Sequence, residues 1–367
     1  MKTIVKCSDL SGAVSKVVKA VSTKTTNPVL EGIKLSCKGD TLTLSATDME
    51  IAIEKTIDAD TFMEGEVVVP GKLFAEFIKK ISEGEEIELS SADANKLKIA
   101  YNQADTLMQC LSCEEFPEIK KDYNASSFTM SQKDFKDLIL KTSFACSQDF
   151  SRPVLRGCLI EVENNRAKCV ALDGFRLAIM NKEVKESTDK VKAIVPARAL
   201  VEITRLMEKD EDLITIFIQD NNLMVEVDNT VFTTRLLEGQ FINYKQIIPQ
   251  NYTTTVKVDA KKFKDSIERA SIVARDSKNM VKIDIKEGYV NVTANSEVGN
   301  VNENIPIELN GQDLVIAFNS KFLIDCINVI DDENLYMNFN SSIAPCVIKP
   351  ENGDDYLYMI LPIRINI

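Results

Sequence analysis

The chain of 367 residues contains no histidine and no tryptophan, and only 7% of its residues are aromatic. Without histidine, it has no Ser-His-Asp or Cys-His nucleophilic system and no HExxH metal site. An enzyme that uses a carboxylate, lysine or tyrosine stays open. Because 44% of the residues are hydrophobic, the cores are expected to be sizeable and built from aliphatic side chains.

Long hydrophobic runs are also missing. No stretch approaches the ~18 consecutive apolar residues of a membrane span. The first residues, "MKTIVKCSDL", lack the long apolar core of a signal peptide. We therefore expect a cytoplasmic protein with no membrane partner.

The nine cysteines are odd in number and irregular in spacing, which disfavours a disulfide framework. Cys110 and Cys113 form a CxxC pair, but no second pair has comparable spacing, and a zinc site needs about four ligands. Packing of strands and turns is the simpler interpretation of these thiols. We expect no metal and no cofactor.

Three segments share one order of a short strand, a polar step and an amphipathic helix. Leu10, Phe135 and Phe263 occupy the same place in each, at offsets of 125 and 128 residues. Apolar residues recur at helical spacing in all three segments. A fixed period of this kind indicates a repeated structural unit.

Further sets of segments follow in the same order. Hairpin-like strands begin at "PVLEG" from Pro28 and at "PVLRG" from Pro153, 125 residues apart, with a degenerate third copy from Val281. A strand followed by a helix recurs at 67–81, 193–207 and 315–330. Strand pairs come last in each copy.

Each third of the chain is therefore predicted to be β-α-β-β-β-α-β-β-β, over about 120 residues. Runs of strands with two isolated helices predict an α+β fold, with both helices on one side of antiparallel sheets. The polar junctions predict domains at 1–120, 121–250 and 251–367. No low-complexity linker separates these domains, so we expect one rigid curved unit.

Charge is distributed unevenly along the chain, whose formal net charge is −12. The predicted helices carry 18 basic and 10 acidic residues, a balance of +8, so the remainder totals −20. These helices are expected at 9–24, 71–81, 132–148, 196–209, 260–276 and 319–330. Basic helices in an acidic chain favour a polyanion partner. Compensation of the helix dipole is the alternative for basic residues late in each helix.

The order and spacing of these segments resemble the bacterial DNA polymerase III beta subunit family, the sliding clamps, over the whole chain. The resemblance is carried by "NPVLEGIKL", "LSATDMEIAIE", "RPVLRGCLIEV", "VALDGFRLAI", "GQFINYKQIIP" and "MILPIRI". It implies three clamp domains in a crescent, with helices inside and antiparallel sheets outside, that close as a ring-shaped homodimer. The last domain would carry a pocket-forming C-terminal tail.

The resemblance implies a processivity factor rather than an enzyme. Its partners would be double-stranded DNA, bound without regard to sequence, the DNA polymerase III catalytic subunit, the clamp loader, and other polymerases and repair proteins. No base-reading motif is visible, which agrees with weak contacts to the DNA backbone that permit sliding.

A partner-peptide pocket between the second and third copies is also implied by the resemblance. Leu172, Phe175 and Ile242 depart from the family pattern, where threonine, histidine and proline are usual. Arg176 and Arg364 are expected to orient peptide carbonyls or an acidic flank. The positions that match the family pocket are Arg152, Leu155, Leu172, Gly174, Phe175, Arg176, Leu177, Ile242, Ile247, Ile343, Met359, Leu361, Pro362, Ile363 and Arg364.

For the dimer edge, the resemblance pairs Thr106 and Met108 of one chain with Ile272 and Val273 of the other, and Thr106 replaces a bulky aromatic. Asp149 replaces an amide in a loop near DNA, so this loop is expected to contribute less. The cations expected to face DNA are Lys24, Lys72, Lys79, Lys80, Lys136, Lys141, Arg198 and Arg205.

Two other hypotheses compete with a clamp. One is an enzyme that acts on a phosphorylated substrate through Asp173 and Arg176. The other is a purely structural repeat protein, which does not predict basic helices. Asp173 aligns with Asp48 of the first copy, whereas Ile51 replaces Arg176. A repeated aspartate at a turn predicts a structural role in capping turn amides.

Overall fold

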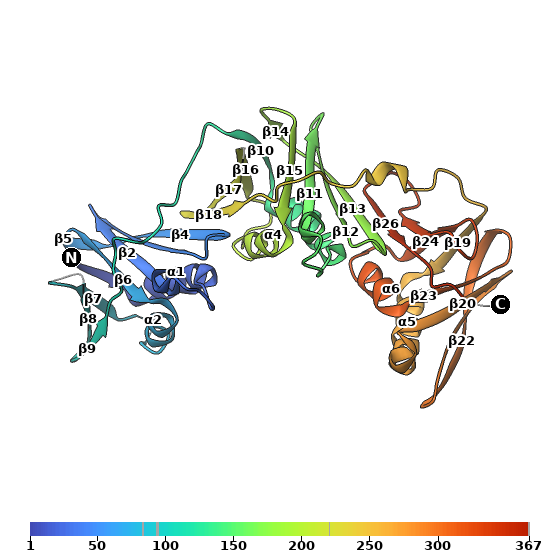
Figure 1. Ribbon diagram of the computed structural model, residues 1–367, viewed down its shortest axis with the longest axis horizontal. Coiled ribbons are helices and arrows are strands. Elements are labelled where there is room, and N and C mark those ends of the chain that lie inside the picture. Colours follow the sequence, from blue (N-terminus) through green and yellow to red (C-terminus); the bar gives the residue numbers. More distant parts are fainter. Residues whose placement is uncertain (83, 93–94, 220, 366–367) are drawn as a thin grey trace. The chain divides into compact units, whose positions relative to one another are not determined.

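The computed structural model describes residues 1–82, 84–92, 95–219 and 221–365, and it divides into two compact units (Figure 1). Unit 1 comprises Met1–Gln132, Glu186–Thr188 and Arg198–Leu236. Unit 2 comprises Lys133–Lys185, Asp189–Ala197 and Leu237–Ile367. The predicted second copy therefore contributes strands to both units.

Unit 1 is built on two antiparallel sheets, of order β5-β1-β7-β8-β9 and β14-β10-β16-β17-β18-β4-β3-β2-β6. The elements of the first copy are β1 (Lys2–Lys6), α1 (Cys7–Val17), β2 (Gly32–Lys38), β3 (Thr41–Thr47), β4 (Ile51–Asp58), β5 (Asp60–Met63), β6 (Gly65–Pro70), α2 (Gly71–Ile78), β7 (Glu86–Ser90), β8 (Lys96–Tyr101) and β9 (Ala104–Gln109). The elements of the second copy in this unit are β10 (Ser126–Ser131), β14 (Glu186–Ser187), α4 (Ala197–Thr204), β16 (Leu213–Gln219), β17 (Asn222–Val227) and β18 (Thr230–Arg235).

Unit 2 contains one antiparallel sheet of order β15-β11-β12-β13-β26-β25-β24-β19-β22-β21-β20-β23. The elements of the second copy in this unit are α3 (Gln132–Leu140), β11 (Gly157–Glu163), β12 (Arg166–Leu172), β13 (Arg176–Glu183) and β15 (Val191–Pro196). Those of the third copy are β19 (Thr254–Asp259), α5 (Ala260–Val273), β20 (Met280–Lys286), β21 (Tyr289–Ser296), β22 (Gly299–Gly311), β23 (Leu314–Asn319), α6 (Ser320–Ile327), β24 (Asn334–Phe339), β25 (Cys346–Lys349) and β26 (Tyr356–Ile360).

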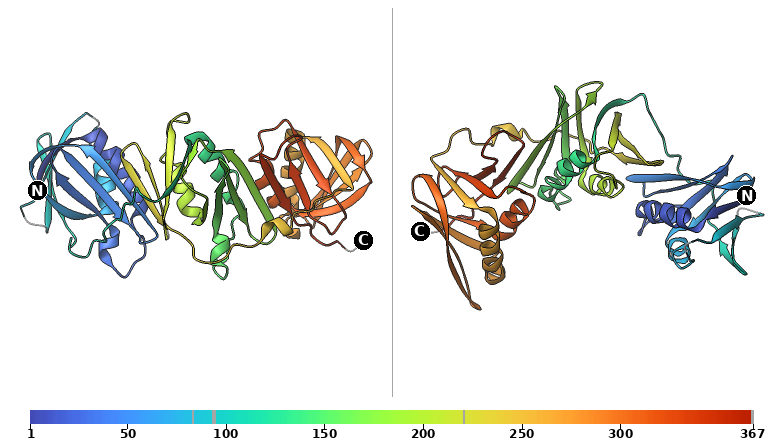
Figure 2. Two further views of the ribbon diagram at one scale, coloured as in Figure 1. Left: turned by 90° about the horizontal axis from the view of Figure 1, so that it is seen from above. Right: turned by 180° about the vertical axis from the view of Figure 1, so that it is seen from behind.

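The six predicted helices are all present, and each is shorter than its predicted window. Their apolar stripes pack inward, as in α5, where Phe263, Ile267 and Ala270 are buried. α1 contacts α2 and the strands β3 and β4, while α5 contacts α6 and the strands β21 and β22 (Figure 2). Short 3-10 turns lie at Val18–Ala20, Pro28–Glu31, Ser143–Ala145, Pro153–Arg156, Tyr244–Gln246 and Ala274–Ser277.

Each copy has four longer strands between its two helices in the described part of the chain, one more than predicted. The segment from Gly32 to Asp58 contains two turns, which separate three strands. Gly39, with φ 56°, lies in the first turn, and Met49, with φ 72°, lies in the second. The sequence predicted the second turn at Asp48 but not the left-handed residue in it, because methionine does not normally signal this conformation.

The copies are joined by strand pairs in one register. In unit 1, β4 pairs with β18 so that Ile51 lies opposite Thr234. In unit 2, β13 pairs with β26 so that Arg176 lies opposite Ile360. Because Arg176 follows Ile51 by the repeat offset of 125 residues, the two junctions are equivalent strand for strand.

A single backbone hydrogen bond to an edge strand is also repeated three times, and we call it the edge bond. In each copy, the N–H group of a residue that follows the last strand donates to a carbonyl on β6, β15 or β23. The three edge bonds run from Leu111 to Val68 (2.7 Å), from Leu237 to Ile194 (2.8 Å) and from Ile363 to Ala317 (2.7 Å). The C-terminal tail therefore takes the place in the third copy that a linker takes in the other two.

Candidate functional site

The turn at Asp173 is capped as the sequence predicts. One carboxylate oxygen of Asp173 accepts hydrogen bonds from the backbone N–H groups of Phe175 (2.8 Å) and Arg176 (3.0 Å). Asp48 caps the equivalent turn of the first copy, accepting from the N–H groups of Glu50 and Ile51. The prediction of a structural aspartate is confirmed, because both copies use it in the same way.

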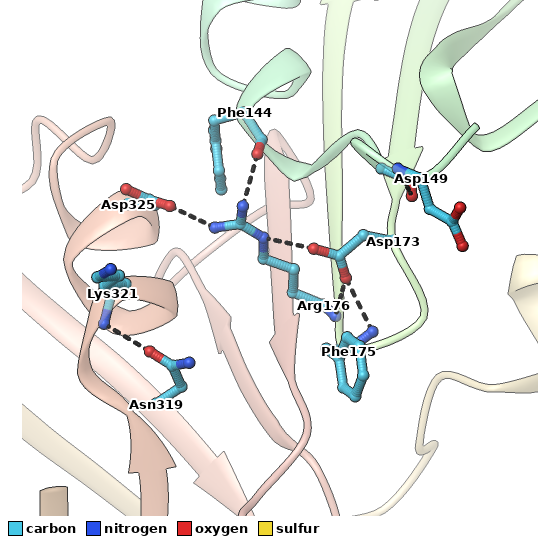
Figure 3. Close-up of polar contacts among 9 residues, drawn as sticks. Phe144, Asp149, Asp173, Phe175, Arg176, Asn319, Lys321 and Asp325 are labelled. Atoms are coloured by element: carbon cyan, nitrogen blue, oxygen red, sulfur yellow. Dashed lines mark hydrogen bonds and ion pairs between the residues drawn. The ribbon is translucent and has the colours of Figure 1, made fainter. Parts of the chain in front are cut away.

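The Arg176 side chain lies inside unit 2 and is only 10% exposed (Figure 3). Its Nε donates to Asp173 (3.0 Å), one Nη donates to Asp325 (2.5 Å) and the other donates to the carbonyl oxygen of Phe144 (2.8 Å). The guanidinium carbon also lies 4.6 Å from the ring centroid of Phe322. Every guanidinium nitrogen thus has a partner within the chain, as in a structural ion pair rather than a free anion site.

Sequence reasoning missed Phe322 and Asp325. Both lie on α6, three residues apart, and residues at this spacing lie on one face of a helix. Their spacing is visible in the sequence and places both on one side of the helix. Nothing in the sequence indicated that their partner is Arg176, about 150 residues earlier.

A group of buried side chains, which we call the apolar cluster, lies beside this turn in unit 2. Four predicted pocket residues belong to it: Leu155, Leu172, Leu177 and Met359, all at most 4% exposed. The cluster also contains Leu159, Val170, Ile179, Ile194, Phe241, Tyr244 and Val347. Because these side chains are buried, they offer little free surface of their own.

Other predicted pocket residues are exposed, although they are apolar. Their exposed fractions are 61% for Phe175, 44% for Ile242, 45% for Ile247, 71% for Ile343 and 38% for Leu361. Large apolar side chains that are exposed in this way are typical of a surface that binds a partner. The cluster and these side chains come from segments far apart in the chain.

The turn and the C-terminal tail are tied together at this surface. The N–H group of Leu361 donates to the carbonyl oxygen of Phe175 (2.8 Å). The Phe175 ring stacks on Phe322, with ring centroids 6.2 Å apart. Gly174 has φ 94°, and a Cβ atom there would lie 3.7 Å from the guanidinium of Arg152. Pro362 and Ile363 are half-buried, while Arg152 and Arg364 are exposed.

The predicted DNA-facing cations fall into two groups. Lys24, Lys72, Lys79 and Lys80 are exposed and form no ion pair with the described residues. Lys24 lies in a loop rather than on a helix, because α1 ends at Val17.

The remaining cations of that set are less available. Lys136 is half-buried. Arg198 pairs with Asp48 at 3.0 Å, and Arg205 pairs with Glu202. Lys141 pairs with Asp331, and its side chain is only 18% exposed. A cation that is already paired offers less to a phosphate group than a free one.

The predicted dimer residues differ in exposure. Met108 is 5% exposed and packs inside its own sheet, whereas its neighbour Leu107, which the sequence did not single out, is 58% exposed. Side chains alternate along a strand, so Leu107 and Met108 lie on opposite faces of β9. Ile272 is 59% exposed, while Thr106 and Val273 are half-buried.

The cysteines are free thiols, and the described residues contain no group of three or more metal-ligating side chains. Burial raises the pKa of the Cys113 and Cys326 thiols, which disfavours the reactive thiolate. In the described part of the chain, no helix has the length and apolar character required to span a membrane.

Comparison with known proteins decides the family. Residues 1–120 match the N-terminal domain of the DNA polymerase III beta subunit, residues 129–243 match its central domain, and residues 245–364 match its C-terminal domain. The chain belongs to the DNA polymerase III beta subunit family.

Individual relatives cover nearly the whole chain. The Beta sliding clamp of Halalkalibacterium halodurans is 34% identical over 96% of each chain, and that of Staphylococcus aureus is 32% identical over 95% of each. The crystal structure of the DNA polymerase sliding clamp from Bacillus subtilis matches with a TM-score of 0.97 at 27% identity, covering 100% of both chains. These matches support the α+β clamp architecture that the repeat predicted.

Proposed function

We propose that this family member is a DNA sliding clamp, in which two chains close a ring around duplex DNA and confer processivity on DNA polymerase III. Membership of the family and the order of its three domain matches support this function. The clamp is not an enzyme in this proposal. The internal partners of Arg176 and Asp173 favour a structural role over phosphate chemistry.

Ring closure is supported mainly by one observation, that the two internal junctions, β4 with β18 and β13 with β26, share one register. The repeat equates β9 with β18 and β26, and it equates the beginning of β22 with those of β4 and β13. β9 is an edge strand, and residues 299–303 have a paired strand on one side only among the pairings of the described residues. An open edge of this length is a template for another chain.

A second copy can therefore repeat the junction. Antiparallel pairing of β9 with β22 of the partner chain would extend the sheet across the dimer. It would also bring the exposed Leu107 into the interface. When the register of the internal junctions is applied to this edge, three residues of one chain face three of its partner. Met108 then lies opposite Gly299 of the partner subunit, Leu107 opposite Asn300 of the partner subunit, and Thr106 opposite Val301 of the partner subunit.

The domain boundaries we propose are 1–120, 121–250 and 251–367. Lys24, Lys72, Lys79 and Lys80 are the proposed main contacts to DNA, because they are exposed and have no ion pair within the described residues. Lys136, Lys141, Arg198 and Arg205 are proposed as weaker contacts.

The proposed partner-peptide site consists of the apolar cluster together with the exposed residues around it. It binds a short segment of the DNA polymerase III catalytic subunit, the clamp loader, or another polymerase or repair protein. Apolar anchors of the peptide pack against Phe175, Ile242, Ile247, Ile343 and Leu361, and Arg152 and Arg364 favour an acidic flank. Arg176 positions the turn rather than meeting the peptide as a free cation.

Ring closure is tested by loading the protein onto nicked circular DNA and then linearising the circle. A topologically linked ring stays on the circle in high salt and slides off the free ends after cutting. Equal retention on circular and linear DNA would show that direct affinity, and not encirclement, holds the protein.

The peptide site is tested with Phe175→Ala combined with Leu361→Ala. Both side chains are exposed, so the fold is expected to tolerate the change. Stimulation of DNA polymerase III is expected to fall about tenfold or more, as for a lost hot spot of about 2 kcal/mol. Phe62→Ala, which removes an aromatic side chain 66% exposed on β5, is the matched control. Unchanged stimulation in the double variant would remove these residues from the site.

A further inference from the structure

Unit 1 contains a cavity of about 190 Å³ at the junction between the first and second copies. Four parts of unit 1 line it: the turn after β3 (47 and 49–52), the linker at 117–120, Asn222 at the start of β17 and the end of β18 (233–235). The function proposed above does not use this cavity.

The cavity occupies the position of the proposed peptide site in the equivalent junction of unit 2. Repeat offsets of 125 or 126 residues relate its lining to predicted pocket residues. Glu50 takes the place of Phe175, Pro117 that of Ile242, and Thr233 that of Met359. The backbone follows the same equivalence, because the N–H group of Arg235 donates to the carbonyl oxygen of Glu50 (3.0 Å), as that of Leu361 donates to Phe175.

Met49 provides an independent observation at the mouth of this cavity. It takes the place of Gly174 and holds φ 72° although it is not glycine, a conformation that costs about 1 kcal/mol. Its side chain is nevertheless 60% exposed, so packing within the chain does not explain its position. Methionine is an adaptable apolar side chain that is common on surfaces that bind peptides.

The chemistry of this cavity differs from that of the second junction. Ile51, Ala52, Pro117 and Ile119 give it apolar walls. Glu50 at the tip of the turn replaces an aromatic residue, its side chain is 75% exposed, and its carboxylate lies 3.8 Å from the guanidinium of Arg198. Asn27 stands where the second junction has Arg152. Glu118, Lys120 and Arg235 also line the cavity, with charges of both signs. The charge that distinguishes this turn from the turn of the second junction is therefore that of Glu50.

We propose that this cavity is a second peptide site. Its occupant is an extended segment of a partner protein that places one large apolar side chain in the cavity and a lysine or arginine beside Glu50. The existence of the cavity and the residues that line it do not depend on the function proposed above. The class of ligand rests on the peptide site proposed for the second junction.

Two fluorescein-labelled tetrapeptides serve as probes, Lys-Leu-Phe-Lys and Glu-Leu-Phe-Glu, with fluorescence anisotropy measured on the full-length chain without DNA. The Lys probe is expected to bind, and Glu50→Lys is expected to weaken it about fivefold or more by reversing the charge beside it. Phe175→Lys makes the equivalent change at the second junction and so reports which junction the probe occupies. The Lys probe is expected to keep its affinity for that variant.

Methionine-methyl NMR gives a measurement that does not depend on a binding-site variant. The Met49 resonance, assigned by its loss in Met49→Ala, is expected to shift when the Lys probe is added. The inference is overturned by absent binding, by a tighter Glu probe at this junction, by an unmoved Met49 resonance, or by loss of Lys-probe binding in Phe175→Lys alone. Each of these results leaves polymerase stimulation, which tests the second junction, unaffected.

Discussion

One hydrogen bond of the proposed dimer can be removed without disturbing the monomer. Both internal junctions contain a bond from the residue after the strand pair to the tip of the facing turn, as from Leu361 to Phe175. The repeat puts Gln109 in the donor position and Val298 in the acceptor position. We therefore expect the Gln109 N–H group to donate to the carbonyl oxygen of Val298 of the partner subunit.

The direction of this N–H group follows from its neighbour. The N–H group of Cys110 donates to the carbonyl oxygen of Asn95 inside the first sheet (2.8 Å). Successive N–H groups of a strand point to opposite sides, so that of Gln109 points to the open edge. Gln109→Pro therefore deletes a donor at the edge, where proline is tolerated, and keeps the bonds to β8.

The expected loss can be worked out from this geometry. One missing backbone hydrogen bond costs about 1 kcal/mol, and the carbonyl left without a partner costs about 1 kcal/mol more. Val298 is 73% exposed, so we use the lower limit of the cost for its unpaired carbonyl group. The sum of about 2 kcal/mol per interface occurs twice in a closed ring and raises the dissociation constant about a thousandfold.

Sedimentation velocity over a wide concentration range measures this dissociation constant, and urea unfolding checks the monomer. The Gln109→Pro dimer is expected to dissociate at protein concentrations at which the parent is still dimeric. Its free energy of unfolding is expected to stay within about 0.5 kcal/mol of that of the parent. Cys110→Pro, which deletes the inward donor, is the control and is expected to destabilise the monomer. A Gln109→Pro dimer as tight as the parent would refute the transferred register.

Three further outcomes are expected. Met49→Gly relieves a left-handed conformation and is expected to raise the free energy of unfolding by about 1 kcal/mol at most, measured by urea titration with an unchanged m-value. Asp173→Ala removes the acceptor of two turn amides and a partner of Arg176, and it is expected to lower the free energy of unfolding by about 2–3 kcal/mol, whereas Asp173→Asn, which keeps an acceptor, loses less. Lys72→Glu with Lys79→Glu is expected to lower DNA affinity equally for all sequences and to reduce the salt slope by about 2, measured by DNA-binding titrations from low to moderate salt.

The repeat made much of the fold predictable, because it is local and periodic. All six helices lie where apolar spacing predicted them. The capping role of Asp173 followed from its alignment with Asp48, since an aspartate kept in two copies of a turn indicates a backbone requirement. The left-handed conformation of Met49 in the first of these turns was not predictable, because methionine is not a residue that normally adopts it.

The remaining details depend on contacts between distant segments. Lys141 remains a predicted DNA contact, and its ion pair with Asp331 of a later segment could not be read from the sequence. Met108 remains a predicted residue of the dimer edge, and the sequence did not show that its side chain is buried while that of Leu107 is exposed. The face on which a strand residue lies depends on register, and a shift of one residue exchanges the two faces. Composition and spacing do not fix that register.

The third edge bond has a consequence for engineering the protein. Ile363 is bonded to β23 as Leu111 is bonded to β6. The C-terminal tail therefore ends at the position in the third copy that corresponds to the beginning of the linker after the first copy. In the proposed ring, a second gene copy joined to this tail through the sequence of residues 112–125 continues the chain as a fourth repeat would. The product is a covalent tandem with one interface left to open. A clamp built in this way would allow the opening of a single, known interface to be measured apart from dissociation of the dimer.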